Sequence, residues 1–266
     1  MNSHEIKYLR PEQIREEMQK VPLAYLPVGP LEWHGPHLPY GTDPLNAESA
    51  ALRAAAQTGG LVFPTLYFGT ERERTPEVLD WLGLSDQKYI VGMDFPANSL
   101  PSAYCSEEVF ALLIREQLRL LVRLGFRLAM LISGHGATNH LEVLHRLAAE
   151  YSAETPLRVL VAIPFAKNEE GVLVVGHASR VETAIMQSLY PDLVAVDRLP
   201  APPEPLKNAD FAVVDWQTFG GDPTPERTIH ADDDPRLANP DQGRQTAEKA
   251  VRQIVAQVKQ ALAELR

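Results

Sequence analysis

Apolar and polar residues follow one another along the chain in blocks that predict alternating strands and helices. Four apolar runs have the length of buried strands, namely residues 23–28, 61–68, 127–132 and 157–163. Apolar residues at helical spacing predict helices over residues 11–20, 46–57, 107–124, 139–151, 179–189 and 241–265. Strands that alternate with helices build mostly parallel sheets covered on both faces. The order therefore predicts an α/β fold, a three-layer sandwich with a mostly parallel sheet flanked by helices.

Two stretches depart from this pattern. Residues 69–98 form a long irregular excursion, and residues 201–221 are irregular and rich in proline. Loops of that length are usually functional or disordered, and the first has too many aromatic and apolar residues for disorder. No linker, repeat or change of composition divides the chain, so we expect a single domain over residues 1–266.

Polar side chains cluster directly after the first predicted strand. Glu32 and His34 are two residues apart, so in an extended segment their side chains point the same way. Asp43 returns to them if the intervening loop, rich in proline and glycine, folds back. Carboxylate and imidazole groups suit zinc or manganese, and a carboxylate such as Asp43 can bridge two ions. The alternative is a loop whose polar side chains only hydrogen-bond to backbone.

Two more histidines follow apolar runs. His135 lies between Gly134 and Gly136, which permit a tight turn from strand to helix and make its imidazole a candidate ligand. His177 follows the apolar run at residues 172–175, and Glu182 lies at the start of the next helix. The alternative for Glu182 is a carboxylate that only stabilises the helix dipole.

The helix expected after Gly136 carries two further histidines. These are His140 and His145, which lie on or near that helix. We expect them to be surface or packing residues and not ligands.

Composition narrows the classes of function. The 266 residues include 35 acids and 25 bases, a formal net charge of −10 that repels a phosphate backbone. No basic stripe offsets it, so we do not expect nucleic acid as a partner. Cys105 is the one cysteine and cannot form a disulfide within the chain, and no run approaches the roughly 20 apolar residues of a membrane span. The first ten residues lack the apolar core of a signal peptide, so we expect a cytoplasmic protein without a membrane segment.

Taken together, the motifs resemble those of the creatininase (creatinine amidohydrolase) family. Its members share an early G-x-x-E-x-H-G-x-H-L-P segment followed by an Asp, a later G-H-G segment and a G-H-A-x-x-x-E-T segment. The matching residues here are Gly29, Glu32, His34, Gly35, His37, Leu38, Pro39 and Asp43, then Gly134, His135 and Gly136, then Gly176, His177, Ala178, Glu182 and Thr183. Gly221, Asp222 and Pro223 resemble the family's closing G-D-P segment.

The resemblance implies an α/β sandwich with a hydrolytic site for two divalent ions per chain, zinc and/or manganese. Iron is also compatible with Glu, Asp and His ligands. Glu32 and His135 would bind one ion, His34 would bind the other, and Asp43 would bridge them. The resemblance also implies a homo-oligomer, often a hexamer, that acts on a small-molecule substrate.

The remaining ligand and the catalytic group follow from the third motif. Creatininase proper has a ligand Glu shortly after the glycine-flanked His, where this chain has no acid over residues 136–138. Glu182 is therefore the candidate to replace that ligand Glu, both as a metal ligand and as a catalytic residue. His177 would face the substrate and either protonate the leaving atom or hold the substrate's oxygen.

The segments expected to form the pocket differ from the family pattern. Creatininase proper surrounds creatinine with aromatic residues that include Trp. Residues 165–175 contain no Trp, so creatinine itself is not the expected substrate. The family's Y-G-x-S-x-E-H-x-x-F-P-G-T segment is split here by an insertion. It supplies Arg72, Arg74 and Asn98 as candidates to bind a carboxylate or polyol. Alternating Glu and Arg is also typical of a solvated, ion-paired loop.

We expect a dinuclear metal-dependent hydrolase that opens a small cyclic substrate or cleaves an amide. Such chemistry needs no serine or cysteine nucleophile, and the chain has no G-x-S-x-G segment. One alternative within the family is hydrolysis of a keto-inositol (inosose) ring at a C–C bond. An alternative of another class is a catalytically silent, metal-containing protein that binds a small molecule.

Overall fold

The computed structural model describes residues 4–81, 84, 89–95, 98, 100–166, 175–209, 212–214 and 233–265 of the chain. At its centre is a four-stranded sheet in the order β2-β1-β3-β4. The strands are β1 (Leu23–Val28), β2 (Leu61–Val62), β3 (Leu128–Ser133) and β4 (Arg158–Ala162). All neighbouring pairs are parallel. The mostly parallel sheet predicted from the sequence is confirmed.

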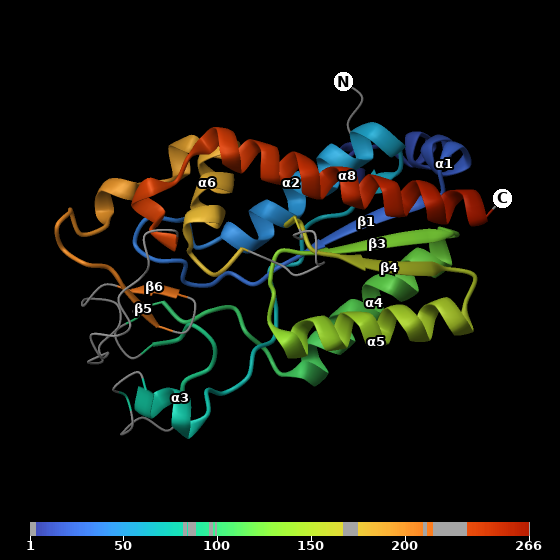
Figure 1. Cartoon of the computed structure of the whole chain (residues 1–266). Coiled ribbons are helices and arrows are strands. Elements are labelled where there is room, and N and C mark those ends of the chain that lie inside the picture. Colours follow the sequence, from blue (N-terminus) through green and yellow to red (C-terminus); the bar gives the residue numbers. More distant parts are fainter. Residues whose placement is uncertain are drawn as a thin grey trace.

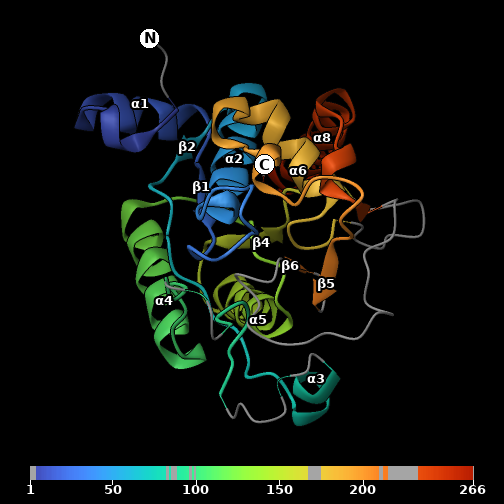
Figure 2. The same ribbon diagram turned by 90° about the vertical axis from the view of Figure 1, so that its left-hand side faces the viewer.

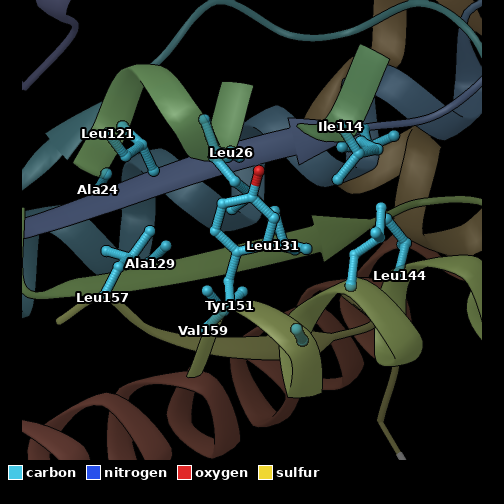
Figure 3. Close-up of a cluster of buried hydrophobic side chains, with 14 of the residues drawn as sticks. Ala24, Leu26, Ile114, Leu121, Ala129, Leu131, Leu144, Tyr151, Leu157 and Val159 are labelled. Carbon is cyan, nitrogen blue, oxygen red and sulfur yellow. The ribbon is translucent and has the colours of Figure 1, made fainter. Parts of the chain in front are cut away.

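Successive side chains of the central strands point to opposite faces of the sheet and fill two cores. From β1, Ala24 and Leu26 enter one core, and Leu23 and Tyr25 enter the other. Figure 3 shows the first core, in which β1 and β3 pack against helices that contribute side chains such as Tyr151. Because both faces are covered, the central strands are continuously apolar in sequence.

Helices cover both faces of the sheet (Figure 1). On one side lie α2 (Thr42–Thr58) and α8 (Pro240–Glu264), and on the other α4 (Glu107–Leu124) and α5 (Thr138–Glu154). Figure 2 shows the same two helical layers from the end of the sheet. Gly125 ends α4 with a left-handed φ of +88°, the C-cap that the sequence predicts. The helices and the sheet form the predicted α/β sandwich.

Shorter elements surround these layers. They are α1 (Pro11–Lys20), α3 (Pro76–Trp81), α6 (Arg180–Leu189) and the antiparallel pair β5 (Lys207–Ala209) and β6 (Ala212–Val214). Single 3-10 turns lie at Ile6–Tyr8, Pro191–Leu193, Val196–Arg198 and Pro235–Leu237. The helix α6 packs against α8 and thereby places its own first turn beside the sheet.

Three sequence predictions need correction. The strand predicted over 61–68 ends at Val62, because Pro64 has no N–H to continue the ladder, although Leu66 N–H still bonds to the Pro27 carbonyl at 3.0 Å. The segments 69–98 and 201–221, predicted to be irregular, contain the helix α3 and the strands β5 and β6, respectively. The helix α2 begins at Thr42 and not at residue 46, so Asp43 lies in its first turn and not in a loop.

The G-D-P segment at residues 221–223 lies outside the described residues. Among the helices that the structure describes, none has both the length and the apolar character to cross a membrane.

Candidate metal centre

The loops that follow β1 and β3 meet the first turns of α2 and α6 at one edge of the sheet. Asp43 packs between the ends of the two strands, because a Cβ at Gly29 would lie 2.9 Å from Asp43 Cβ and one at Gly134 would collide with the Asp43 backbone. Glu182 enters from α6, whose N-cap Ser179 accepts a hydrogen bond from the Glu182 N–H at 3.3 Å. Two glycines and one capped helix thus bring separate segments together.

Asp43 lies at the centre of the cluster. Its Oδ1 is 3.1 Å from His34 Nε2, and its Oδ2 is 3.1 Å from His135 Nδ1. Glu32 Oε1 lies 3.6 Å from His34 Nε2 and 3.4 Å from His135 Nδ1. Glu32 and His34 are each 1% exposed, and Asp43 is 2% exposed. The structure therefore brings together all four of these predicted ligands in a buried site.

Glu182 and His177 complete the cluster. Glu182 Oε2 lies 3.9 Å from His34 Nε2 and accepts a hydrogen bond of 2.7 Å from the N–H of Ala178. Ala178 has a left-handed φ of +50°, an unusual conformation for a residue with a Cβ. The His177 ring lies against that of His34, tilted by 31° with centroids 4.1 Å apart, and its Nδ1 is 3.6 Å from Glu32 Oε1.

These residues form three overlapping groups in which the ligand atoms lie within 4.8 Å of one another. The groups are Glu32 with Asp43 and His135, His34 with Asp43 and Glu182, and Glu32 with His34 and His177. Asp43 belongs to two groups, and its two oxygens face different histidines. This is the arrangement expected of a carboxylate that bridges two cations.

The tautomers of the histidines leave acceptors facing one another. His34 Nδ1 donates to the Glu32 carbonyl at 3.1 Å, so in the neutral ring the lone pair of Nε2 faces the carboxylates. His177 Nε2 donates to the Trp33 carbonyl at 2.6 Å, so its Nδ1 lone pair faces Glu32. His135 Nε2 is buried and has no hydrogen-bond partner among the described residues. Converging lone pairs and buried negative charges need cations between them, so the donor set fits divalent ions.

The pKa values show the same surplus of negative charge. Burial alone would lower the pKa of His34, but the carboxylates of Glu182, Asp43 and Glu32 outweigh it and raise that pKa to about 10. Burial raises the pKa of Glu182 to about 7, against the opposing attraction of His34. Without cations the cluster therefore retains protons that a bound metal would displace.

A cavity of about 550 Å³ opens onto the cluster, and its wall includes Arg72 and Arg74. Arg72 is exposed and bonds to Glu142 at 2.6 Å, which matches the alternative of a solvated, ion-paired loop. Arg74 is held in the wall, where its Nε donates to the Gly92 carbonyl at 2.7 Å. Binding of substrate by either arginine stays a prediction.

Asn98 does not share this position. It is not among the described residues of the cavity wall, and its Nδ2 donates to the Met93 carbonyl at 2.6 Å. Asn98 is thus hydrogen-bonded within its own loop, and contact of Asn98 with substrate stays a prediction.

Sequence reasoning did not identify two residues beside the cluster. The Tyr104 hydroxyl donates to Glu32 Oε2, and Glu71 Oε2 lies 3.9 Å from His135 Nε2. Burial, followed by the charge of Glu32, raises the pKa of Tyr104 well above its ordinary value. The family pattern has Ser at the position of Glu71, and this difference could have identified Glu71 as a residue of the site. No motif marks Tyr104.

His140 packs below the centre, as predicted. It is fully buried, stacks on Phe110 with centroids 4.3 Å apart, and accepts a hydrogen bond from the Thr70 N–H at 3.4 Å. Its Nε2 therefore carries the hydrogen and donates to Ser133 Oγ at 3.1 Å, while the Ser133 hydroxyl donates to the His135 carbonyl at 2.7 Å. This chain of bonds holds the turn that presents His135.

Comparison with known proteins gives consistent relatives. The family model Creatininase, described as creatinine amidohydrolase, matches residues 7–258. The chain is 31% identical over 191 residues to creatinine amidohydrolase of Pseudomonas putida, which covers 65% of this chain and 66% of that protein. It is 24% identical over 202 residues to 3-dehydro-scyllo-inosose hydrolase of Thermotoga maritima, with 71% and 58% covered. The chain thus spans two thirds or less of the length of these curated relatives.

Solved structures show the same fold. A crystal structure of creatinine amidohydrolase (creatininase) has a TM-score of 0.70 at 23% identity and covers 98% of this chain and 99% of that one. A mutant creatininase of Zn-Zn type, with a TM-score of 0.69, and a creatininase with Mn, with a TM-score of 0.68, match at 23% identity with the same coverage.

Proposed function

Because the chain belongs to the creatininase family, we propose that it is a hydrolase dependent on two divalent ions that opens a small cyclic amide or cleaves a related amide. The observation that carries this proposal is the buried cluster in which Asp43 is shared between two groups of ligand atoms. The similar creatininases of Zn-Zn type and with Mn support zinc or manganese as the metals.

The ligands divide between the two ions according to their distances. Glu32 and His135 would hold the first ion, His34 and Glu182 the second, and Asp43 both. When bound, the ions would polarise the scissile bond and lower the pKa of a nearby water. Glu182 would serve the reaction by holding the second ion, in place of the acid that the chain lacks after His135.

His177 would carry the proton in the reaction. Its Nε2–H is engaged by the Trp33 carbonyl, and its Nδ1 is free to accept. We infer that Nδ1 takes a proton from the attacking water and passes it to the leaving nitrogen.

A keto-inositol substrate is the second candidate. The relative from Thermotoga maritima is named 3-dehydro-scyllo-inosose hydrolase. The cavity wall supports this choice because it carries charged side chains of both signs, which suit a polyol. Its charged members include Glu71, Arg72, Glu73 and Arg74.

Metal analysis tests the proposal directly. Protein purified without chelators should contain about two ions per chain. Asp43→Ala should lose both, because the shared ligand is removed. Asp241→Ala, at an exposed side chain in the first turn of α8, is the matched control and should keep the metal content of the wild type. A folded wild-type protein without metal would contradict the proposal.

Activity decides between the substrate classes. A panel of lactams, hydantoins, formamides and keto-inositols should give turnover that disappears with a chelator and returns with zinc or manganese. Bound metal without turnover of any member would favour the catalytically silent binding protein instead. A homo-oligomer, a cytoplasmic location and a single domain stay predictions.

A further inference from the structure

Tyr104 is held beside the metal centre by its backbone and by its hydroxyl. The next residue, Cys105, donates its N–H to the Gly69 carbonyl at 2.9 Å and ties the segment to the loop after β2. The Tyr104 hydroxyl accepts a hydrogen bond from the Met93 N–H at 3.4 Å and donates to Glu32 Oε2. A phenol has one hydrogen, so its single donor is committed to Glu32.

The two oxygens of Glu32 therefore have different surroundings. Oε2 is engaged by Tyr104, whereas Oε1 faces the ring nitrogens of three histidines. The distances from Oε1 are 3.4 Å to His135 Nδ1, 3.6 Å to His34 Nε2 and 3.6 Å to His177 Nδ1. One oxygen alone is directed at the ligand cluster.

Gly92 provides the space that the hydroxyl occupies. It has a φ of +52°, and a Cβ there would lie 2.6 Å from Tyr104 Oη and 2.6 Å from Glu71 Cγ. Gly92 and Met93 both belong to the stretch that departs from the family pattern. Two of the residues that surround the Tyr104 hydroxyl thus lie in the insertion, outside the shared motifs.

We propose that Tyr104 is a positioning residue that makes Glu32 a ligand through one oxygen, by occupying Oε2 and directing Oε1 to the metal. This inference rests on the proposed function, because it requires that ions bind. Hydrogen-bond partners of metal ligands commonly set the ligand's orientation, and their loss costs about 10–100-fold in metal affinity. Without the hydroxyl, the carboxylate is free to rotate or to offer both oxygens.

Tyr104→Phe tests the proposal, because it removes the hydroxyl and leaves the ring. The control is Tyr25→Phe, which removes another buried hydroxyl, bonded to Thr58 Oγ1 at 2.6 Å and outside the ligand cluster. In competition with a chelator, Tyr104→Phe should bind one zinc ion about 10–100-fold more weakly, and Tyr25→Phe should bind as the wild type does. With Co²⁺ in place of zinc, the visible absorption of Tyr104→Phe alone should change, since it reports coordination geometry.

A double-mutant cycle shows whether the hydroxyl acts through Glu32. In a Glu32→Gln background, Tyr104→Phe should cause little further loss of zinc affinity. An undiminished loss in that background, or unchanged affinity and absorption in Tyr104→Phe alone, would overturn the proposal. If Tyr104→Phe does not fold, Gly92→Ala displaces the same hydroxyl and should weaken the same ion. A wild type without metal overturns both proposals, whereas normal zinc binding by Tyr104→Phe overturns this one alone.

Discussion

The two glycines that flank His135 have different surroundings. Gly134 packs against the backbone of Asp43, and a Cβ there would collide with the Asp43 carbonyl group. Gly136 has no heavy atom within 4 Å of a Cβ built on it. Both glycines permit a tight turn. Only Gly134 is closely approached by the first turn of α2, so the absence of a side chain at Gly134 helps to place Asp43.

Replacement of Gly134 by alanine should therefore impair the protein, whereas the same replacement of Gly136 should not. Gly134→Ala should push Asp43 away, lower the unfolding free energy by about 1–3 kcal/mol and remove metal. Gly136→Ala is the matched control and should keep both stability and metal content. Thermal melting with metal analysis checks both, and equal behaviour of the two variants would contradict this account.

His37 is a buried histidine outside the ligand groups. Its Nε2 lies 2.9 Å from Thr183 Oγ1, next in sequence to Glu182. Burial, followed by the charge of His34, lowers the pKa of His37 to about 4. The folded protein therefore keeps this ring neutral, while the unfolded chain takes up a proton below its ordinary value of about 6.5.

Stability of the metal-free protein should consequently fall with acid. Neutral His37 makes its full contribution to the unfolding free energy above pH 6.5. That contribution is lost as the pH falls to about 4, which lowers the unfolding free energy by about 3 kcal/mol. His37→Gln should reduce the slope of unfolding free energy against pH in that window. Urea titrations at several pH values measure it, with His145→Gln, at an exposed position of α5, as the control. An unchanged slope in His37→Gln would exclude this assignment.

At the scale of elements, the crossing of α6 and α8 sets the position of Glu182. Gly243, in the first turns of α8, lies against the α6 backbone, and a Cβ there would collide with the Ala184 carbonyl. Glu182 is one turn or less from this contact. A glycine inside a helix normally weakens the helix. Gly243 is suitable here because α6 and α8 pack too closely to leave space for a side chain.

Gly243→Ala should destabilise the protein even though alanine favours helices. The intrinsic gain of up to about 1 kcal/mol is smaller than the overpacking cost of about 1–3 kcal/mol or more. Because α6 must move, metal affinity should fall as well. Gln245→Ala, exposed on the same helix, should change neither quantity by more than about 0.5 kcal/mol. Thermal melts and chelator competition provide the two readouts, and a more stable Gly243→Ala would refute the argument.

At the scale of the whole molecule, the centre joins segments that are distant in sequence. Glu32, Asp43, His135 and Glu182 come from β1, α2, β3 and α6 or the loops beside them. Burial of three carboxylates at one place opposes folding unless cations compensate their charge. Metal ions bound here would therefore connect α2 and α6 to the loops that follow β1 and β3.

Removal of metal should lower the melting temperature. Free metal at about 1,000 times its dissociation constant stabilises by about 4 kcal/mol, which corresponds to a shift on the order of 10 °C for a chain of this size. Calorimetry after dialysis against a chelator should show this shift, and addition of zinc or manganese should reverse it. An unchanged melting temperature in protein verified to be metal-free would contradict a structural contribution of the ions.

Much of the fold was predictable because its signals are local. The apolar run at 23–28 and the helix at 107–124 have the bounds that the pattern indicates. The early start of α2 was not predictable, because Asp43 and Pro44 are tolerated both in a loop and in a first helical turn. Likewise, nothing local shows that Asn98 bonds to the Met93 carbonyl.

Periodicity and motif spacing are properties of neighbouring residues, so the residue types and order of the predicted ligands and the alternation of strands and helices can be read from the chain. Which lone pair each histidine presents, which oxygens of Asp43 and Glu32 face which partner, and the contact of Tyr104 with Glu32 follow only from the folded protein. Those features depend on hydrogen bonds between segments that loops of variable course bring together. Such contacts leave no mark on the local pattern.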